Sequence, residues 1–226
     1  MVRFAHSRWL PALAVALLLS PSSLPAADQP AAVRWEKDLA KFATADRENL
    51  PTQGGILFLG SSSIRKWDTL AEDFAGLPVL NRGFGGSQMS DAADLVEQLV
   101  FPYAPRQIVL YEGDNDLNNG KSHERVLSDF RTFVDRVRER LPGCRISIIA
   151  IKPSPKRWHL KETIYYTNRL LSEWAMVDPK LDFIDVVRPM LDENGEPRPE
   201  LFVEDGVHMT PAGYAIWTQA VRPFLH

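Results

Sequence analysis

Short, continuous apolar runs alternate along the chain with longer segments in which apolar residues recur at helical spacing. An apolar run without polar alternation is typical of a strand that is buried on both faces of a sheet. We therefore expect strands at residues 56–59, 79–80, 108–111, 146–151 and 181–186.

Amphipathic segments separate these runs and predict helices. Between residues 122 and 140, for example, Val126, Phe130 and Phe133 fall on one helical face. Near the C-terminus, Thr210 is a suitable N-cap and Pro211 a suitable first helical residue. The expected helices span residues 32–49, 91–99, 122–140, 160–176 and 211–224.

Strands that alternate with helices indicate βαβ units and hence a parallel sheet. The connections in such units are right-handed, and ligands bind at the carboxyl ends of the strands. Two Pro-rich segments, 152–158 and 196–199, are expected to form surface loops on that rim. Because no internal repeat or linker interrupts the pattern, we expect a single domain over residues 27–226.

Residues 1–26 have the pattern of a cleavable signal peptide. Arg3 and Arg8 precede the apolar run 9–19, and the small residues at 24–27 suit signal peptidase. The apolar run is shorter than the roughly 20 residues that span a bilayer, so no stable membrane anchor is expected. The sequence thus predicts export, to the periplasm or out of the cell, with cleavage after residue 26 or 27.

The charge balance and the single cysteine restrict the possible partners and cofactors. With 26 basic and 29 acidic residues, the net charge of −3 argues against a nucleic-acid partner. Cys144 directly precedes a predicted strand, so we expect a buried, unreactive thiol. The sequence contains no Cys/His cluster or phosphate-binding loop, which implies no cofactor and no metal, and it carries no signal for an oligomeric state.

Four short polar segments carry candidate chemistry, and three of them directly follow predicted strands. In the first, a serine at a strand-to-helix turn projects its hydroxyl at the carboxyl edge of the sheet, although Ser-rich turns also cap helices. In the second, glycines let the backbone approach a ligand and direct an N–H at developing negative charge. A dinucleotide-binding G-x-G-x-x-G would need glycine at Gln88, so that alternative fails. The four segments are residues 60–63, 81–86, 112–116 and 205–208.

In the third segment, Asn115 could supply its side-chain amide as an oxyanion donor. The competing interpretation is an EF-hand calcium loop that starts at Asp114. Such a loop needs glycine at its sixth position and glutamate at its twelfth, where this chain has Asn119 and Arg125. A calcium site is therefore not expected here.

In the fourth segment, Asp205 precedes His208 by three residues and can reach its Nδ1. That contact holds the imidazole in the tautomer whose Nε2 accepts a proton from a serine. The alternative is a loop in which both side chains only cap backbone groups. His123 and His159 have no acid at this spacing and are expected at the surface.

Together the four segments resemble the blocks that define the SGNH hydrolase superfamily, also called GDSL-type esterases, lipases and acylhydrolases. The resemblance implies that Ser62 is the nucleophile and that Asp205 and His208 complete a catalytic triad. It also implies an oxyanion hole formed by the N–H groups of Ser62 and Gly86 and by the Asn115 amide. The protein would then be a serine esterase that cleaves carboxylic esters through an acyl-enzyme on Ser62.

The fold that the resemblance implies is a three-layer α/β/α sandwich around a flavodoxin-like parallel sheet of about five strands. The resemblance covers about residues 55–224, which is most of the chain. One position departs from the family pattern, since Ser61 stands where the first block usually carries aspartate. Because that aspartate lies outside the triad, we expect activity to be kept.

Two alternatives to a general esterase stay open. One is a carbohydrate O-acetylesterase of the acetyl-xylan type, with exposed aromatic rings as a platform for sugar. We expect most of the candidate rings in the core, however. The other alternative is a non-catalytic binding module on the same fold. The candidate rings are Trp67, Trp158, Tyr165 and Tyr166.

An α/β-hydrolase is a poorer match, because Ile64 stands where its G-x-S-x-G motif needs the second glycine. The expected substrate is a small-molecule, glycan or lipid ester. Segment 152–158 follows the fourth predicted strand and is expected to form a wall of the substrate site, with Arg157 and Trp158 as contacts. It could equally be a rigid surface turn.

Overall fold

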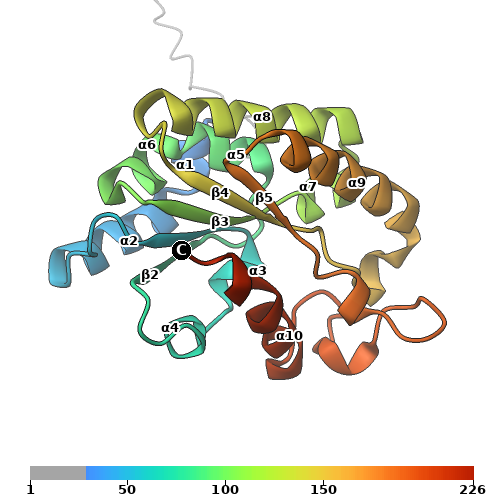
Figure 1. The fold of residues 1–226 in the computed structure, drawn as a ribbon. Coiled ribbons are helices and arrows are strands. Elements are labelled where there is room, and N and C mark those ends of the chain that lie inside the picture. The colour runs from blue at the N-terminus through green and yellow to red at the C-terminus, as the bar shows by residue number, and fades with distance from the viewer. Residues whose placement is uncertain (1–28) are drawn as a thin grey trace, which may run out of the picture.

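The strands of the sheet are short and largely apolar. The computed structural model describes residues 29–226, and its five strands are all parallel, in the order β2-β1-β3-β4-β5 (Figure 1). Every residue of β1 and β3 is buried, because both faces of the sheet are covered. The strands are β1 (Ile56–Gly60), β2 (Val79–Gly83), β3 (Gln107–Tyr111), β4 (Arg145–Ile149) and β5 (Leu181–Ile184).

Helices cover both faces of this sheet, so the predicted three-layer α/β/α sandwich is confirmed. On one face lie α5, α6, α8 and α9, and on the other lie α3, α4 and α10 (Figure 1). The helices are α1 (Ala31–Arg34), α2 (Glu36–Glu48), α3 (Ser62–Arg65), α4 (Leu70–Asp73), α5 (Met89–Asp94), α6 (Val96–Leu99), α7 (Asp114–Asn118), α8 (His123–Arg140), α9 (Lys161–Val177) and α10 (Pro211–Val221). The 3-10 helices are η2 (Phe101–Tyr103), η3 (Pro155–Leu160), η4 (Arg188–Met190), η5 (Pro199–Leu201) and η6 (Arg222–Phe224).

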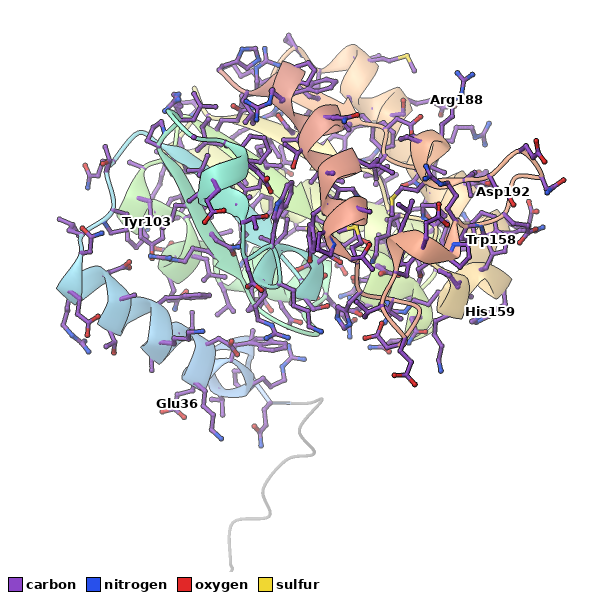
Figure 2. All side chains as sticks on the ribbon, turned by 90° about the horizontal axis from the view of Figure 1, so that it is seen from below. Glu36, Tyr103, Trp158, His159, Arg188 and Asp192 are labelled. Atoms are coloured by element: carbon purple, nitrogen blue, oxygen red, sulfur yellow. The ribbon has the colours of Figure 1, made fainter. Side chains whose placement is uncertain are left out.

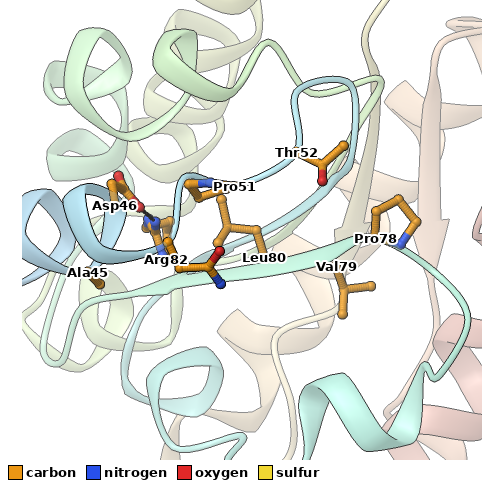
Figure 3. A pocket seen from close by; sticks show the side chains of 9 residues that line it. Ala45, Asp46, Pro51, Thr52, Pro78, Val79, Leu80 and Arg82 are labelled. Atoms are coloured by element: carbon orange, nitrogen blue, oxygen red, sulfur yellow. Dashed lines mark hydrogen bonds and ion pairs between the residues drawn. The ribbon is translucent and has the colours of Figure 1, made fainter.

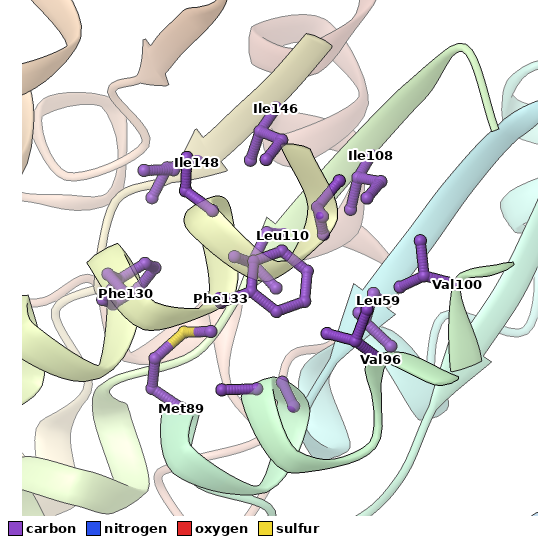
Figure 4. Close-up of a cluster of buried hydrophobic side chains, with 14 of the residues drawn as sticks. Leu59, Met89, Val96, Val100, Ile108, Leu110, Phe130, Phe133, Ile146 and Ile148 are labelled. Carbon is purple, nitrogen blue, oxygen red and sulfur yellow. The ribbon is translucent and has the colours of Figure 1, made fainter. Parts of the chain in front are cut away.

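Each face of the sheet has its own hydrophobic cluster. On the α8 face, Phe130 and Phe133 belong to the cluster that includes Leu110 of β3 (Figure 4). On the α10 face, the rings of Trp67 and Trp217 pack with their centroids 5.8 Å apart. Full burial of one such large apolar side chain contributes roughly 1.5–3 kcal/mol. The two clusters therefore hold the helices against the sheet from both sides.

Two of the predicted helices are interrupted. The segment 32–49 is divided at Trp35 and the segment 91–99 at Leu95, where φ is −107° and −101°. Both side chains are held by tertiary packing, since the Trp35 ring lies 5.2 Å from that of Phe84 and Leu95 is buried. Helical periodicity in the sequence contains no information about these tertiary contacts, so it cannot predict the two breaks.

β2 is longer than predicted because its polar half is covered. The Arg82 guanidinium forms an ion pair with Asp46 of α2 and donates a hydrogen bond to the Tyr103 hydroxyl (2.8 Å). It also lies 5.0 Å from the centre of the Phe42 ring. Arg82 is therefore buried although it belongs to an edge strand. A cavity of about 310 Å³ lies beside this ion pair, between α2 and β2 (Figure 3).

Segment 152–158 is not the surface loop that the sequence predicts. Lys152 at its start is fully buried, because its Nζ lies 2.9 Å from the Asp114 carboxylate, which compensates the charge. The segment then continues into η3. Within this segment, only the residues of η3 are exposed to solvent. Trp158 and His159 of this helix lie at the end of the molecule opposite α2 (Figure 2).

The expectation that the candidate aromatic rings lie mostly in the core is correct only in part. Trp67 is buried, whereas Trp158 is half-buried. Tyr165 and Tyr166 are 39% and 41% exposed. The buried face of α9 is supplied by other residues, such as Leu171, so these two tyrosines remain at the surface.

Three further predictions concern the termini and the cysteine. The predicted signal peptide, residues 1–26, lies outside the described residues. Within residues 29–226, no helix combines the length and the apolar character needed to cross a bilayer. Cys144 is buried, as predicted, and this burial raises the pKa of its thiol to about 12.

Candidate active site

Three of the four polar segments meet at the carboxyl edge of the sheet because their strands are parallel and in register. Gly60 at the end of β1 is paired with Gly83 on one side and with Tyr111 on the other. A Cβ at Gly60 would lie 2.0 Å from the Tyr111 carbonyl oxygen, and φ there is +142°. Only glycine suits this position. The chain then turns directly into α3, whose first residue is Ser62.

Ser62, His208 and Asp205 form a continuous hydrogen-bonded chain. The Ser62 Oγ lies 2.8 Å from His208 Nε2, and His208 Nδ1 lies 2.5 Å from Asp205 Oδ2. An ionised carboxylate can only accept, so the imidazole proton belongs on Nδ1. Nε2 is then free to accept the hydroxyl proton of Ser62. The structure thus brings together the three residues that the sequence places in a triad.

The Asp205 carboxylate is held in its ionised form. Its Oδ1 accepts hydrogen bonds from the backbone N–H groups of Val207 (2.8 Å) and His208 (2.9 Å). Partial burial opposes ionisation, but the hydrogen bonds from His208 and Val207 outweigh it and lower the pKa of Asp205 well below its usual range. The carboxylate therefore stays charged beneath the imidazole at every pH at which an esterase would work.

Gly86 and Asn115 line the same cleft as Ser62 and His208. Gly86 has a φ of +87°, a conformation that favours glycine. The Asn115 Nδ2 donates to the Ser87 carbonyl oxygen (2.8 Å), which ties α7 to the loop after β2. The structure thus brings the two predicted oxyanion donors into the cleft that contains Ser62.

The cleft at this site has a volume of about 710 Å³. Arg157, predicted as a substrate contact, is among its lining residues. Trp158, also predicted as a contact, is not, because its ring packs against that of Tyr165 (5.7 Å). The side chains and backbone that line the cleft belong to Ser62, Arg65, Gly85, Gly86, Asn115, Pro155, Lys156, Arg157, Glu204, Asp205, Gly206, Val207 and His208.

Several charged residues of the site are missed by the sequence analysis. Arg65 and Lys156 line the cleft from α3 and η3. Beneath it, the buried Asp114 carboxylate lies between Lys152 (2.9 Å) and Arg157 (2.7 Å). Burial works to raise the pKa of Asp114, but the two cations outweigh it and lower the pKa. One signal in the sequence could have pointed to this buried charge cluster. Lys152 directly follows an apolar predicted strand, at the carboxyl edge of the sheet.

Several known proteins are similar to this chain in sequence or in fold. Over 198 residues the chain is 23% identical to the Homo sapiens platelet-activating factor acetylhydrolase IB subunit alpha1, and the match covers 85% of this chain and 83% of that protein. A Streptococcus pneumonia structure named for platelet activating factor superposes with a TM-score of 0.76 at 22% identity, over 84% of this chain and 92% of the other. A carbohydrate esterase family 3 structure from Talaromyces cellulolyticus superposes with a TM-score of 0.63 at 19% identity, over 75% of this chain and 94% of the other.

The two structural likenesses show the fold alone, whereas the sequence profile of a family is more specific. Residues 52–216 match the profile of the GDSL-like Lipase/Acylhydrolase family, and this range contains all four polar segments. With the sheet order, the Ser62–His208 contact and this match in agreement, the chain belongs to the GDSL-like lipase/acylhydrolase family.

Proposed function

We propose that the protein is a serine esterase that cleaves carboxylic esters through an acyl-enzyme on Ser62. The observation that carries the proposal is the 2.8 Å contact between Ser62 Oγ and His208 Nε2, two residues that line the cleft. In the first step, Oγ attacks the ester carbonyl while Nε2 takes the hydroxyl proton. The ionised Asp205 stabilises the imidazolium that forms.

The negative charge that develops on the carbonyl oxygen needs hydrogen-bond donors that are already in place. In this proposal they are the N–H groups of Ser62 and Gly86 and the second N–H of the Asn115 amide. Removal of one donor from such a hole typically costs about 2.7–4 kcal/mol of transition-state stabilisation. The alcohol leaves with the proton from His208, and water then releases the acid by the reverse sequence.

The test is hydrolysis of aryl esters of increasing acyl length by the Ser62→Ala variant and its parent. Loss of the nucleophile is expected to lower kcat by roughly 10⁶-fold, as in other serine hydrolases. Ser63→Ala is the matched control, because Ser63 is buried next to Ser62 and is expected to leave the activity unchanged. Full activity of Ser62→Ala would refute the proposal.

The acyl group that we propose is short. The curated relative is named as an acetylhydrolase, and Pro155 and Val207 are the only apolar side chains among the residues that line the cleft, which leaves little to hold a long acyl chain. We therefore expect kcat/KM to fall as the acyl chain of the aryl ester lengthens beyond a few carbons. A preference for long chains would contradict this assignment.

A carbohydrate O-acetylesterase is the second candidate, and the exposed tyrosines favour it. Tyr165 and Tyr166 lie on α9, and the Tyr165 ring contacts Trp158 of η3, next to a cleft residue. The likeness to a carbohydrate esterase structure supports the same direction. Acetylated xylan, a lysophospholipid and aryl acetates, assayed side by side, separate the two candidates. If none is hydrolysed and Ser62→Ala binds ligands as the parent does, the protein is a binding module.

A further inference from the structure

Arg157 joins two consecutive residues of α7 through its guanidinium group. Its Nη2 donates a hydrogen bond to Asn115 Oδ1 (3.0 Å), and its Nη1 lies 2.7 Å from Asp114 Oδ1. The side chain is only 13% exposed although the residue lines the cleft. The planar, two-pronged shape of the guanidinium allows one side chain to make both contacts at once.

The contact with Asn115 decides which way its amide faces. A guanidinium has donors and no acceptor, so only the Oδ1 atom of the amide can face it. The Nδ2 atom must then lie on the other side, where it donates one hydrogen to the Ser87 carbonyl oxygen (2.8 Å). Its second hydrogen remains for the cleft that Asn115 shares with Ser62. Without Arg157, the amide could turn its acceptor oxygen toward a developing oxyanion.

The guanidinium is itself anchored from below by buried groups. Asp114 is buried and accepts a hydrogen bond from Lys152 Nζ (2.9 Å), which is fully buried. Lys152 Nζ also donates to the Tyr111 hydroxyl (3.0 Å) at the end of β3. The orientation of Arg157 is therefore set by the sheet and not by solvent.

The backbone that carries Arg157 is also tied to the histidine loop. The N–H of Lys156 donates to the Gly206 carbonyl oxygen (3.1 Å), and the N–H of Arg157 donates to that of Ser154 (3.0 Å). Gly206 stands between Asp205 and His208. The helix η3 thus connects the two sides of the cleft at a fixed distance.

We propose that Arg157 is a positioning residue that orients the Asn115 amide so that its N–H faces the oxyanion. The role rests on the proposed esterase function, and it is distinct from the substrate contact that the sequence predicts for Arg157. It requires that Arg157 act through Asn115 and that removal of Arg157 lower kcat more than it raises KM.

A double-mutant cycle on the full chain tests this role. Arg157→Ala is expected to lower kcat by about 100-fold, because misplacement of a catalytic group by about 1 Å can cost that much. Its KM is expected to stay within about twofold of the parent value. In the Asn115→Ala background, removal of Arg157 is expected to have no further effect, since residues that act as a unit are not additive. Arg47→Ala, which removes an exposed arginine of α2, is the matched control.

Two further measurements separate positioning from folding and from substrate binding. Added methylguanidinium is expected to restore part of the activity of Arg157→Ala. Arg157→Lys is expected to restore little activity, because one ammonium group cannot make the two contacts of the planar guanidinium. A rise in KM at unchanged kcat in Arg157→Ala would overturn the role. An equal loss of kcat on removal of Arg157 from the parent and from Asn115→Ala would overturn it as well. These outcomes leave the esterase assignment intact. An active Ser62→Ala protein would overturn the esterase assignment and this role together.

Discussion

Glu112 is a fully buried carboxyl group two residues before the first residue of α7, the helix that carries Asn115. Its Oε1 lies 2.5 Å from Ser87 Oγ, which also lies 2.9 Å from the Phe84 carbonyl oxygen. The hydroxyl has one proton, and a carbonyl can only accept. Ser87 therefore cannot donate to Glu112 and to Phe84 at the same time, and a protonated Glu112 would supply the proton of the shorter contact. Burial, and then the neighbouring Asp116, raise the pKa of Glu112 well above its usual range and outweigh the hydrogen bond from Ser87, which lowers it, so we expect Glu112 to be protonated.

The neutral state of Glu112 predicts a dependence of stability on pH. An acid whose pKa is higher in the folded than in the unfolded protein makes folding less favourable as the pH rises above its unfolded value, about 4.3. Glu112→Gln stays neutral and can still donate to Ser87. We expect this variant to melt near the parent at pH 4.5 and above it at pH 8, by about 2–4 °C for each kcal/mol gained.

Calorimetry of parent and variant at the two pH values checks this expectation. Glu139→Gln removes an exposed carboxylate from α8 and serves as the matched control. If Glu112→Gln and its parent differ by the same amount at both pH values, Glu112 is not held neutral in the fold.

At the residue scale, local geometry predicts a contact only when the partners are close along the chain, and the contact of Ser62 with His208, 146 positions apart, is implied by the family resemblance instead. Asp205 and His208 are three residues apart, so their contact follows from local geometry. The contact of Arg157 with Asn115 joins residues 42 positions apart, and it depends on how η3 packs on α7. The sequence therefore predicts only a substrate contact for Arg157, because nothing local reveals its contact with Asn115.

At the element scale, helix α2 covers the edge strand β2. The ion pair between Arg82 and Asp46 and the hydrogen bond to Tyr103 bury a charge that would otherwise be exposed at the edge. A covered edge is protected from pairing with other chains. The sequence predicts α2 from its amphipathic pattern, but not its place, because nothing local relates it to β2.

Removal of Arg82 is expected to destabilise the fold strongly. Arg82→Ala leaves Asp46 without its cation and opens space beside Phe42. Removal of one partner of a buried ion pair costs about 3–5 kcal/mol of folding free energy. Because Arg82 is only slightly exposed, we expect the cost of Arg82→Ala to lie near this range. Urea unfolding of Arg82→Ala and of the exposed Arg47→Ala measures the difference. A loss no larger than that of Arg47→Ala would show that the pair contributes little.

At the scale of the whole molecule, the order of strands and helices was the most predictable feature. Buried parallel strands must be apolar throughout, so their positions are marked in the sequence whatever their partners. The strand ends then place three of the four polar segments on one edge. Breaks such as those at Trp35 and Leu95 could not be predicted, because each serves a contact with another part of the sandwich.

We also propose that the mature protein begins at Ala27 or Asp28, after export. Expression of the full chain in a bacterial host is expected to yield a periplasmic or secreted product that lacks residues 1–26 or 1–27. Intact-mass analysis of that product gives the cleavage site to the residue. A cytoplasmic product with an intact leader would contradict the prediction.

The aromatic cluster on the α10 face gives the protein an optical property. Trp217 is fully buried, and the Trp67 ring lies 5.4 Å from that of Tyr214, whose hydroxyl donates to the Ser63 carbonyl oxygen (3.0 Å). Ser63 is the neighbour of Ser62, so a shift of this backbone changes the surroundings of buried indole rings. Intrinsic fluorescence can therefore follow events at Ser62 for natural esters that have no chromophore.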